Sequence, residues 1–249
     1  MIRPRIGITV DEHERPDYYT SPAAYASAVE RAGGLPLLLP YQTDHALIGE
    51  YLDTLDGILF TGGDDLDPAA YGQPLHPKAI PVAKSREEFE RALLAAVERR
   101  HMPALGVCMG FQLMNIYRGG SLHQFLPDQP RTPNIEHRTV DQTPAMHDVH
   151  LDIHTTLGKA IGRADIVANS YHKQAVDRLG RGLRIVATAP DRLIEAFEDP
   201  SLPLFAAVQR HPERMAEHPE HLAPFQLLVR TAREQNGSRG GESHNKSTA

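Results

Sequence analysis

The first half of the chain alternates short apolar segments with segments of helical pattern. Apolar segments occupy residues 6–10, 35–39, 57–61 and 104–107, and the segments 21–32, 44–55 and 85–100 lie between them. In the last helical segment, Phe89, Leu93 and Val97 recur at a spacing of four, which places them on one face of a helix. This alternation predicts a parallel sheet with crossover helices.

The second half has a different pattern. Residues 149–153, 166–168, 183–189, 193–198 and 205–208 form short apolar segments separated by turn residues, and residues 220–234 have helical composition. These segments indicate antiparallel or mixed strands followed by a closing helix. The predicted fold class is therefore α/β, with a mostly parallel central sheet flanked by helices and a smaller antiparallel β portion in the second half.

The division of the chain follows from composition. No repeat or linker interrupts residues 1–235, so we expect one domain there. Residues 236–249 contain almost no apolar side chains, and we predict a disordered tail for them.

Composition excludes several classes of protein. The 249 residues are 41% hydrophobic and 23% charged, which is close to the globular average. The net charge of −6 argues against broad nucleic-acid binding, which needs a basic patch. Apolar segments fall far short of the ~20 residues of a membrane span, and the N-terminus lacks a signal-peptide pattern. We expect a cytoplasmic protein with no membrane or nucleic-acid partner.

The single cysteine lies in the pattern Gly-x-Cys-x-Gly. Gly106 and Gly110 flank Cys108 between an apolar strand and a helix at residues 111–117, as in the nucleophile elbow of hydrolases. A thiol at a helix N-terminus is shifted toward the nucleophilic thiolate. The alternative is a buried structural cysteine, since free cysteines are commonly inert.

A cysteine nucleophile needs a base and an orienting group. His211 and Glu213 follow the apolar segment 205–208, with a proline between them. A histidine can take the thiol proton and return it to a leaving amine, while a carboxylate orients the ring. The alternative is a helix-entry turn with an exposed histidine.

An acyl oxyanion needs preorganised donors. The amide of Met109, the residue after the nucleophile, is one candidate. Gly62 and Gly63 follow the strand at 57–61 in the same predicted sheet, where ligand sites form beyond the carboxyl ends of strands. Gly63 is therefore the second candidate donor, and a plain Gly-Gly turn is the alternative.

With these motifs in this order, the chain resembles the class I glutamine amidotransferase-like superfamily, whose architecture is flavodoxin-like. Residues 61–72, 110–124, 169–176 and 206–213 further resemble the γ-glutamyl-γ-aminobutyrate hydrolase family, known from putrescine breakdown. The resemblance implies a Cys-His-Glu triad of Cys108, His211 and Glu213, with oxyanion donors at Gly63 and Met109. It also implies no metal and no organic cofactor.

The resemblance further implies a substrate-binding surface at the mouth of the site. Its expected members are Gly62, Gln112, Asn169, Ser170, Tyr171 and His172. For the segment 169–172, the alternative is a hydrogen-bonded loop without a substrate role.

Other conspicuous residues receive separate expectations. Arg210 stands where relatives usually have an aromatic residue. Three alternatives are open for it: it lowers the pKa of the neighbouring histidine, it contacts a substrate carboxylate, or it is a surface residue without a role in the site. Arg86 and Glu90, one helical turn apart, are expected to pair, and a loop-facing role stays open. His147 and His150 would face opposite sides of a strand, so they are not expected to share a metal ion.

The expected activity is hydrolysis of a γ-glutamyl amide through a thioester, with release of glutamate. Two alternatives remain: a glutaminase subunit that delivers ammonia to a separate synthase, and a non-catalytic binding or scaffold protein that kept the fold. The expected partner is a small γ-glutamyl substrate. The sequence leaves open the amine half of that substrate and the oligomeric state, with a homodimer as one option.

Overall fold

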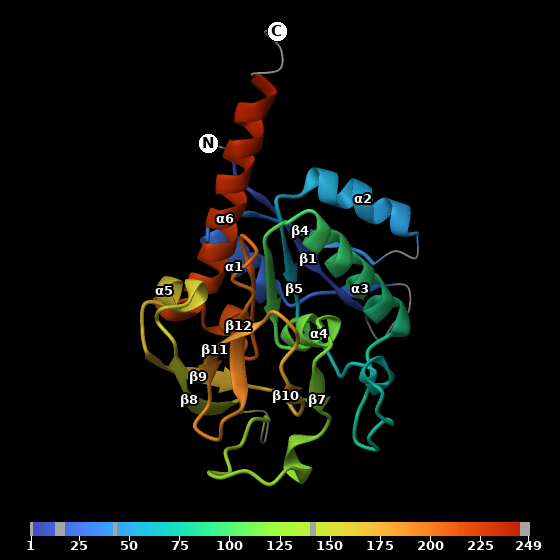
Figure 1. The fold of residues 1–249 in the computed structure, drawn as a ribbon, viewed down its shortest axis with the longest axis vertical. Coiled ribbons are helices and arrows are strands. Elements are labelled where there is room, and N and C mark those ends of the chain that lie inside the picture. Colours follow the sequence, from blue (N-terminus) through green and yellow to red (C-terminus); the bar gives the residue numbers. More distant parts are fainter. Residues whose placement is uncertain (1, 13–17, 42–43, 140–142, 245–249) are drawn as a thin grey trace.

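The computed structural model describes residues 2–12, 18–41, 44–139 and 143–244. Its main sheet contains the nine strands β1 (Arg5–Thr9), β4 (Leu35–Leu39), β5 (Gly57–Phe60), β6 (Ala104–Val107), β8 (Ala145–Leu151), β9 (Asp165–Ser170), β11 (Arg184–Thr188), β12 (Ile194–Glu198) and β13 (Phe205–Val208). Their order across the sheet is β4-β1-β5-β6-β13-β12-β11-β8-β9 (Figure 1).

The direction of the strands changes along this order. The five strands from β4 to β13 are parallel to one another. The pairs from β13 through β12, β11 and β8 to β9 are antiparallel. The predicted fold class is thus confirmed, with the antiparallel portion built from the second half of the chain.

Helices cover both faces of the sheet (Figure 1). Apolar residues of α1 (Ala23–Arg31), α5 (Thr156–Ile161) and α6 (Pro219–His244) share one core with Ile6 and Ile8 of β1. Residues of α2 (His45–Thr54), α3 (Lys84–Arg99) and α4 (Met109–Tyr117) form the opposite core with Ile58 and Phe60 of β5. The alternation of side chains along each strand thus supplies both cores.

Several small elements extend the predicted pattern. Helix α5 and the antiparallel pair β7 (Ser121–His123) and β10 (Ala175–Arg178) have no counterpart in the expectations. Strands β2 (Asp11–Glu12) and β3 (Tyr19–Thr20) also pair. These segments are too short to show a period in the sequence.

The predicted tail is in part helical. Helix α6 continues to His244, so the expectation of disorder from residue 236 is wrong for residues 236–244. The side chain of Asn236 hydrogen-bonds to Asp56, and Gln235 donates to the carbonyl of His101 over 2.9 Å. These contacts anchor the helix, and each further residue then adds a backbone hydrogen bond. Residues 245–249 lie outside the described residues.

Crossing a membrane would require a helix that is both long and apolar. Within the described ranges, no helix combines these two properties.

The close packing of α4 on β5 yields a testable prediction. A Cβ atom on Gly110 would lie 2.4 Å from the carbonyl oxygen of Phe60, and strand backbone cannot move away cheaply. We expect Gly110→Ala to lower the free energy of unfolding by about 1–3 kcal/mol, measured by urea denaturation.

Gly237→Ala is the matched control. No atom lies within 4 Å of a Cβ at this helical position, and alanine favours a helix over glycine by about 1 kcal/mol. The control should lose no stability. Equal stability of Gly110→Ala and the wild type would contradict the described packing.

Candidate active site

Cys108 occupies a sharp turn between strand and helix. It follows β6 directly and caps the N-terminus of α4, with φ 53° and ψ −103°. Positive φ at a non-glycine residue is strained and persists only where the surroundings enforce it. A Cβ on Gly106 would lie 2.8 Å from the backbone of Gly110, so both flanking glycines are needed. The turn expected from Gly-x-Cys-x-Gly is present.

The thiol faces a cavity of about 630 Å³. Cys108 is 6% exposed, and Gln209 Nε2 lies 3.7 Å from its Sγ. The N-terminus of α4 adds a positive field at the same place. Both features direct positive charge density toward the sulfur.

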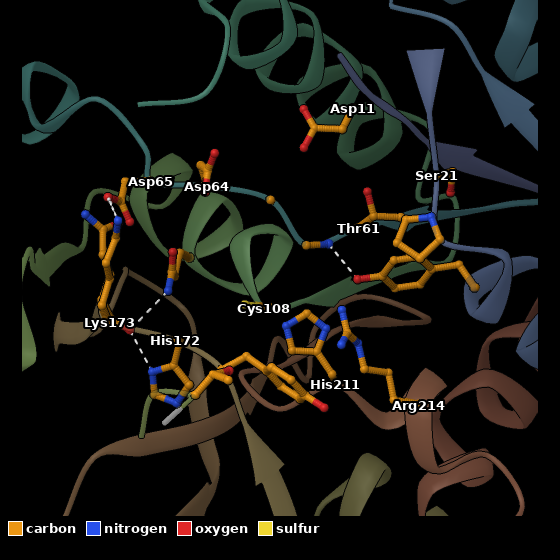
Figure 2. Close-up of a pocket in the computed structure, with 18 of the residues that line it drawn as sticks. Asp11, Ser21, Thr61, Asp64, Asp65, Cys108, His172, Lys173, His211 and Arg214 are labelled. Atoms are coloured by element: carbon orange, nitrogen blue, oxygen red, sulfur yellow. Dashed lines mark hydrogen bonds and ion pairs between the residues drawn. The ribbon is translucent and has the colours of Figure 1, made fainter. Parts of the chain in front are cut away.

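The His211 ring lies beside this thiol (Figure 2), and Glu213 pairs with the ring. Both residues lie at the turn Pro212–Met215 that follows β13, and His211 Nδ1 is 2.7 Å from Glu213 Oε1. Burial lowers the pKa of His211, but the charge and hydrogen bond of Cys108, together with Glu213, outweigh burial and raise this pKa to about 10. The arrangement therefore favours an imidazolium paired with a thiolate.

Asn169 fixes the backbone of the base. Its Nδ2 donates to the carbonyl of His211 and its Oδ1 accepts from the His211 amide, both over 2.9 Å. Asn169 does not line the cavity. Ser170 also lies off the cavity, fully buried, where its hydroxyl donates to the carbonyl of His137. Both side chains are used within the protein, and their expected substrate contacts stay a prediction.

The glycine loop presents amides to the same cavity. Among the residues described, the amides of Gly63 and Met109 have no hydrogen-bond acceptor. The Gly62 amide instead donates to the hydroxyl of Tyr25 over 2.9 Å. A Cβ on Gly62 would lie 2.9 Å from Cε1 of His211, so Gly62 is needed for close approach. Gly63 and Met109 remain the candidate oxyanion donors.

Arg86 holds this loop in place through a hydrogen bond to its backbone. Its side chain is fully buried and donates to the Gly62 carbonyl over 2.8 Å. Its other nitrogens lie 2.9 Å from Glu90 and 2.7 Å from Asp11. The expected pairing with Glu90 is present, and so is the role toward the loop. Removing Arg86 would leave the buried carboxylate of Glu90 unpaired.

The expected substrate residues differ in how they face the cavity. Tyr171 lines it, with its ring edge-on to His211 at 5.2 Å and beneath the Arg214 guanidinium at 4.4 Å. Gln112 lines it too, but its Nε2 is engaged by Gln174 and Gln209, each at 3.2 Å. Tyr171 therefore has the freer surface for a ligand.

His172 lines the cavity, yet its ring is 2% exposed and its Nδ1 lies 2.8 Å from the carbonyl of Gln174. Its polar atoms are directed into the protein rather than to a ligand. A substrate role for His172 stays a prediction.

Sequence reasoning missed four contributors to the site. Tyr25, Lys173, Arg214 and Gln209 touch the loop, the cavity or the thiol. Gln209 and Arg214 flank the His-Pro-Glu motif and were detectable from it, whereas Tyr25 carries no sequence signal because it arrives from helix α1.

Arg210 departs from two of its three expectations. Its side chain is fully buried and does not line the cavity. Burial lowers its pKa to about 10, opposed by the charge of Glu195. Its neighbours in sequence, Gln209 and His211, face the nucleophile just after the end of β13, whereas Arg210 is buried away from the cavity. It is neither a surface residue nor a substrate contact.

Comparison with known proteins places this geometry in a family. The peptidase C26 family model matches residues 4–213. The chain belongs to the peptidase C26 family. The match includes Cys108, His211 and Glu213, so the resemblance drawn from the motifs is confirmed.

Curated relatives agree with this membership, and a solved structure shares the fold. The chain is 40% identical over 238 residues, 92% of its length and 75% of the relative's, to a candidate glutamine amidotransferase of Mycobacterium tuberculosis. It is 30% identical over 225 residues, 86% of its length and 87% of the relative's, to the gamma-glutamyl-gamma-aminobutyrate hydrolase of Escherichia coli K12. The fold matches the crystal structure of a candidate GMP synthase component from Thermoplasma acidophilum with a TM-score of 0.66 and 14% identity, covering 96% and 99% of the two chains.

The charge pairing at the nucleophile predicts a titration. In the wild type, the His211 ring should remain protonated at about pH 8, above the ordinary histidine value of about 6.5, because its pKa is raised to about 10. Cys108→Ala removes the negative partner and should lower this pKa. Nuclear magnetic resonance of the ring Cε1 proton against pH measures both values.

Asp148→Asn is a control, since Asp148 is exposed on β8 and should not move the titration. A wild-type His211 that titrates near its ordinary value, unchanged by Cys108→Ala, would contradict the thiolate–imidazolium pair.

Proposed function

We propose that this chain hydrolyses a γ-glutamyl amide through a thioester on Cys108. The observation that carries the proposal is the convergence of Cys108, His211 and Gly63 on one cavity. Glu213 pairs with His211, and the amides of Gly63 and Met109 have no acceptor among the described residues. The family membership supports an amide hydrolase.

Each group has a chemical task. The Cys108 thiolate attacks the side-chain carbonyl carbon of the glutamyl group, and the oxyanion accepts hydrogen bonds from the Gly63 and Met109 amides. The carbon–nitrogen bond then breaks while the His211 imidazolium protonates the departing amine. Glu213 keeps the ring oriented toward the thiol.

Deacylation reverses the proton flow. His211, now neutral, takes a proton from water as the water oxygen bonds to the thioester carbon. The carbon–sulfur bond breaks, which releases glutamate and restores the thiolate beside the imidazolium.

The cavity also suits a charged substrate. A γ-glutamyl group carries an α-carboxylate and an α-ammonium, and the cavity wall contains both signs, with Arg214 and Arg138 against Asp64 and Asp11. Of these, Arg138 pairs with Glu136 and Asp11 pairs with Arg86. Lys173 lies 3.0 Å from Asp65 and is largely neutralised by it. Arg214 lies beside His211, where the leaving amine departs (Figure 2). A carboxylate on the amine half, as in γ-aminobutyrate, would complement this cation.

The names of the relatives define the comparison substrates. The E. coli relative is named for γ-glutamyl-γ-aminobutyrate, and the mycobacterial relative for glutamine amidotransfer. The amine half therefore has to be varied from γ-aminobutyrate through an uncharged alkylamine to the ammonia of glutamine.

The experiment measures glutamate release from purified protein with three substrates: γ-glutamyl-γ-aminobutyrate, γ-glutamyl-butylamide and glutamine. We expect kcat/KM to be highest for the first and at least about tenfold lower for glutamine, a difference of about 1.4 kcal/mol. Cys108→Ala should release no glutamate from any of them, and Asp148→Asn serves as an unaffected control.

Other outcomes identify the alternatives. A slow enzyme that prefers glutamine would indicate a glutaminase awaiting its synthase. No release from any γ-glutamyl amide would leave a binding or scaffold protein, and release that survives Cys108→Ala would exclude the proposed nucleophile.

A further inference from the structure

A cluster of buried metal-ligating side chains lies outside the catalytic machinery. His137, His147, His172 and Glu195 are 0–6% exposed, and one potential ligand atom of each lies within 4.8 Å of those of the other three. They come from four places in the chain: the segment before β8, β8 itself, the loop after β9, and β12. Nothing in the proposed reaction uses this convergence.

Two of the histidines have a fixed ring tautomer. His147 Nδ1 lies 3.0 Å from the carbonyl of Asp148, and His172 Nδ1 lies 2.8 Å from the carbonyl of Gln174. A carbonyl only accepts, so each Nδ1 carries the proton. The Nε2 of each ring then presents a lone pair, and neither Nε2 has a hydrogen-bond partner among the described residues.

The third histidine is fixed by a carboxylate. His137 Nε2 lies 2.9 Å from Asp191 Oδ2, and the same oxygen forms an ion pair with Arg131 at 2.8 Å. This Nε2 is therefore the protonated nitrogen, and Nδ1 presents the lone pair. The Ser170 hydroxyl lies 3.4 Å from that Nδ1 but donates to the His137 carbonyl. A carboxylate or carbonyl behind each ring is the arrangement that orients metal-binding histidines.

The three lone pairs converge on a carboxylate. Glu195 Oε1 lies 3.8 Å from His137 Nδ1, 3.8 Å from His147 Nε2 and 3.6 Å from His172 Nε2. Neither oxygen of Glu195 has a hydrogen-bond partner among the described residues, and the side chain is fully buried. A buried carboxylate facing three nitrogen lone pairs is unfavourable unless a cation stands between them.

No lysine or arginine in the described ranges forms an ion pair with Glu195, and the groups that face it are the three histidine rings. Arg210 is the buried cation whose charge acts on Glu195, yet none of its three nitrogens has a hydrogen-bond partner within the described part of the chain. Its guanidinium therefore does not contact the carboxylate.

We propose that His137, His147, His172 and Glu195 bind one divalent transition-metal ion, with Zn²⁺ the favoured ion. Imidazole and carboxylate are both ligands of Zn²⁺, and four such ligands about 2.0–2.2 Å from the metal lie about 3.4 Å from one another in a tetrahedron. The observed separations from Glu195 exceed this value by a few tenths of an ångström, and all four ligand atoms lie within 4.8 Å of one another, so the side chains would have to move inward to bind the ion.

The site would be structural rather than catalytic. Four protein ligands complete a tetrahedral shell and leave no position for water. The ion would join β12, which carries Glu195, to three elements that are not its neighbours in the sheet: the segment before β8, β8 itself and the loop after β9. The ion thus holds the loop that contains Tyr171, a wall of the catalytic cavity, against β12.

A chain of contacts leads from the cluster to the nucleophile. The Gln174 carbonyl that binds His172 also accepts from Gln112 Nε2. Gln112 in turn donates to Gln209 Oε1, and Gln209 Nε2 faces Cys108 Sγ. Metal binding would restrict the motion of this series of hydrogen-bonded residues and so help to hold the Gln209 side chain beside the thiol.

The expectation that His147 and His150 do not share a metal ion is consistent with this site. His150 lies on the opposite face of β8, with 60% of its side chain exposed, and pairs with Asp165. The two do not share an ion. The partners of His147 are instead distant in sequence, and their spacing carries no metal-binding motif.

The test uses the untagged full-length protein and measures metal directly. Elemental analysis after gel filtration should find about one equivalent of Zn²⁺ per chain. After removal by a chelator, added Zn²⁺ should rebind with the same stoichiometry and raise the thermal midpoint, because a ligand that binds only the folded state stabilises it.

Variants separate this cluster from other sites. Glu195→Gln and His147→Gln should lose bound Zn²⁺ and the Zn²⁺-dependent rise in thermal midpoint, whereas His150→Ala, on the same strand, should retain both. Cys108→Ala should also retain both, which excludes metal held by the nucleophile. In the Co²⁺-loaded wild type, visible absorption of a tetrahedral ion without a thiolate band would identify the ligand set.

Wild-type protein that holds no metal above background and shows no shift in thermal midpoint with Zn²⁺ would overturn the proposal, and so would unchanged binding in Glu195→Gln. These readouts do not depend on turnover, so they are independent of the proposed hydrolysis.

Discussion

Two backbone hydrogen bonds at the turn around Cys108 hold the catalytic groups together. The Cys108 amide donates to the carbonyl of Val208 over 2.9 Å, and the Gly110 amide donates to the carbonyl of Thr61 over 3.0 Å. The first bond ties the nucleophile to the strand that leads into His211, and the second ties it to the strand that leads into Gly63. The positive φ of Cys108 is maintained by these neighbours. Nucleophile, base and oxyanion loop therefore share one rigid frame at the carboxyl ends of parallel strands.

Buried charge is the second organising feature. Arg86 with Glu90 and His211 with Glu213 are ion pairs removed from water. Such pairs contribute little net stability, because desolvation offsets their attraction, but losing one partner is costly. Here each pair positions something else: Arg86 holds the Gly62 carbonyl, and Glu213 orients the base. The buried Glu195 has no hydrogen-bond partner among the described residues and faces three histidine rings instead, and we infer a bound cation there.

What the sequence could predict depends on the range of the interactions. The parallel half of the sheet and the turn at Cys108 follow from local periodicity and glycine placement, and both are present. The hydrogen bonds between the Asn169 side chain and the His211 backbone join residues that are 42 positions apart in sequence, so no spacing rule reveals them. The helical segment 236–244 was missed because its composition is polar, while its backbone extends a helix already anchored by packing.

The central claim is that the reaction passes through a thioester on Cys108, and mass spectrometry of acid-quenched protein tests it most directly. Wild type mixed with γ-glutamyl-γ-aminobutyrate and quenched within one turnover should gain the mass of one glutamyl group, located on the peptide that contains Cys108. The gain should disappear when the thiol is first alkylated with iodoacetamide, together with turnover. Turnover that persists after complete alkylation, with no glutamyl group on this peptide, would contradict the claim.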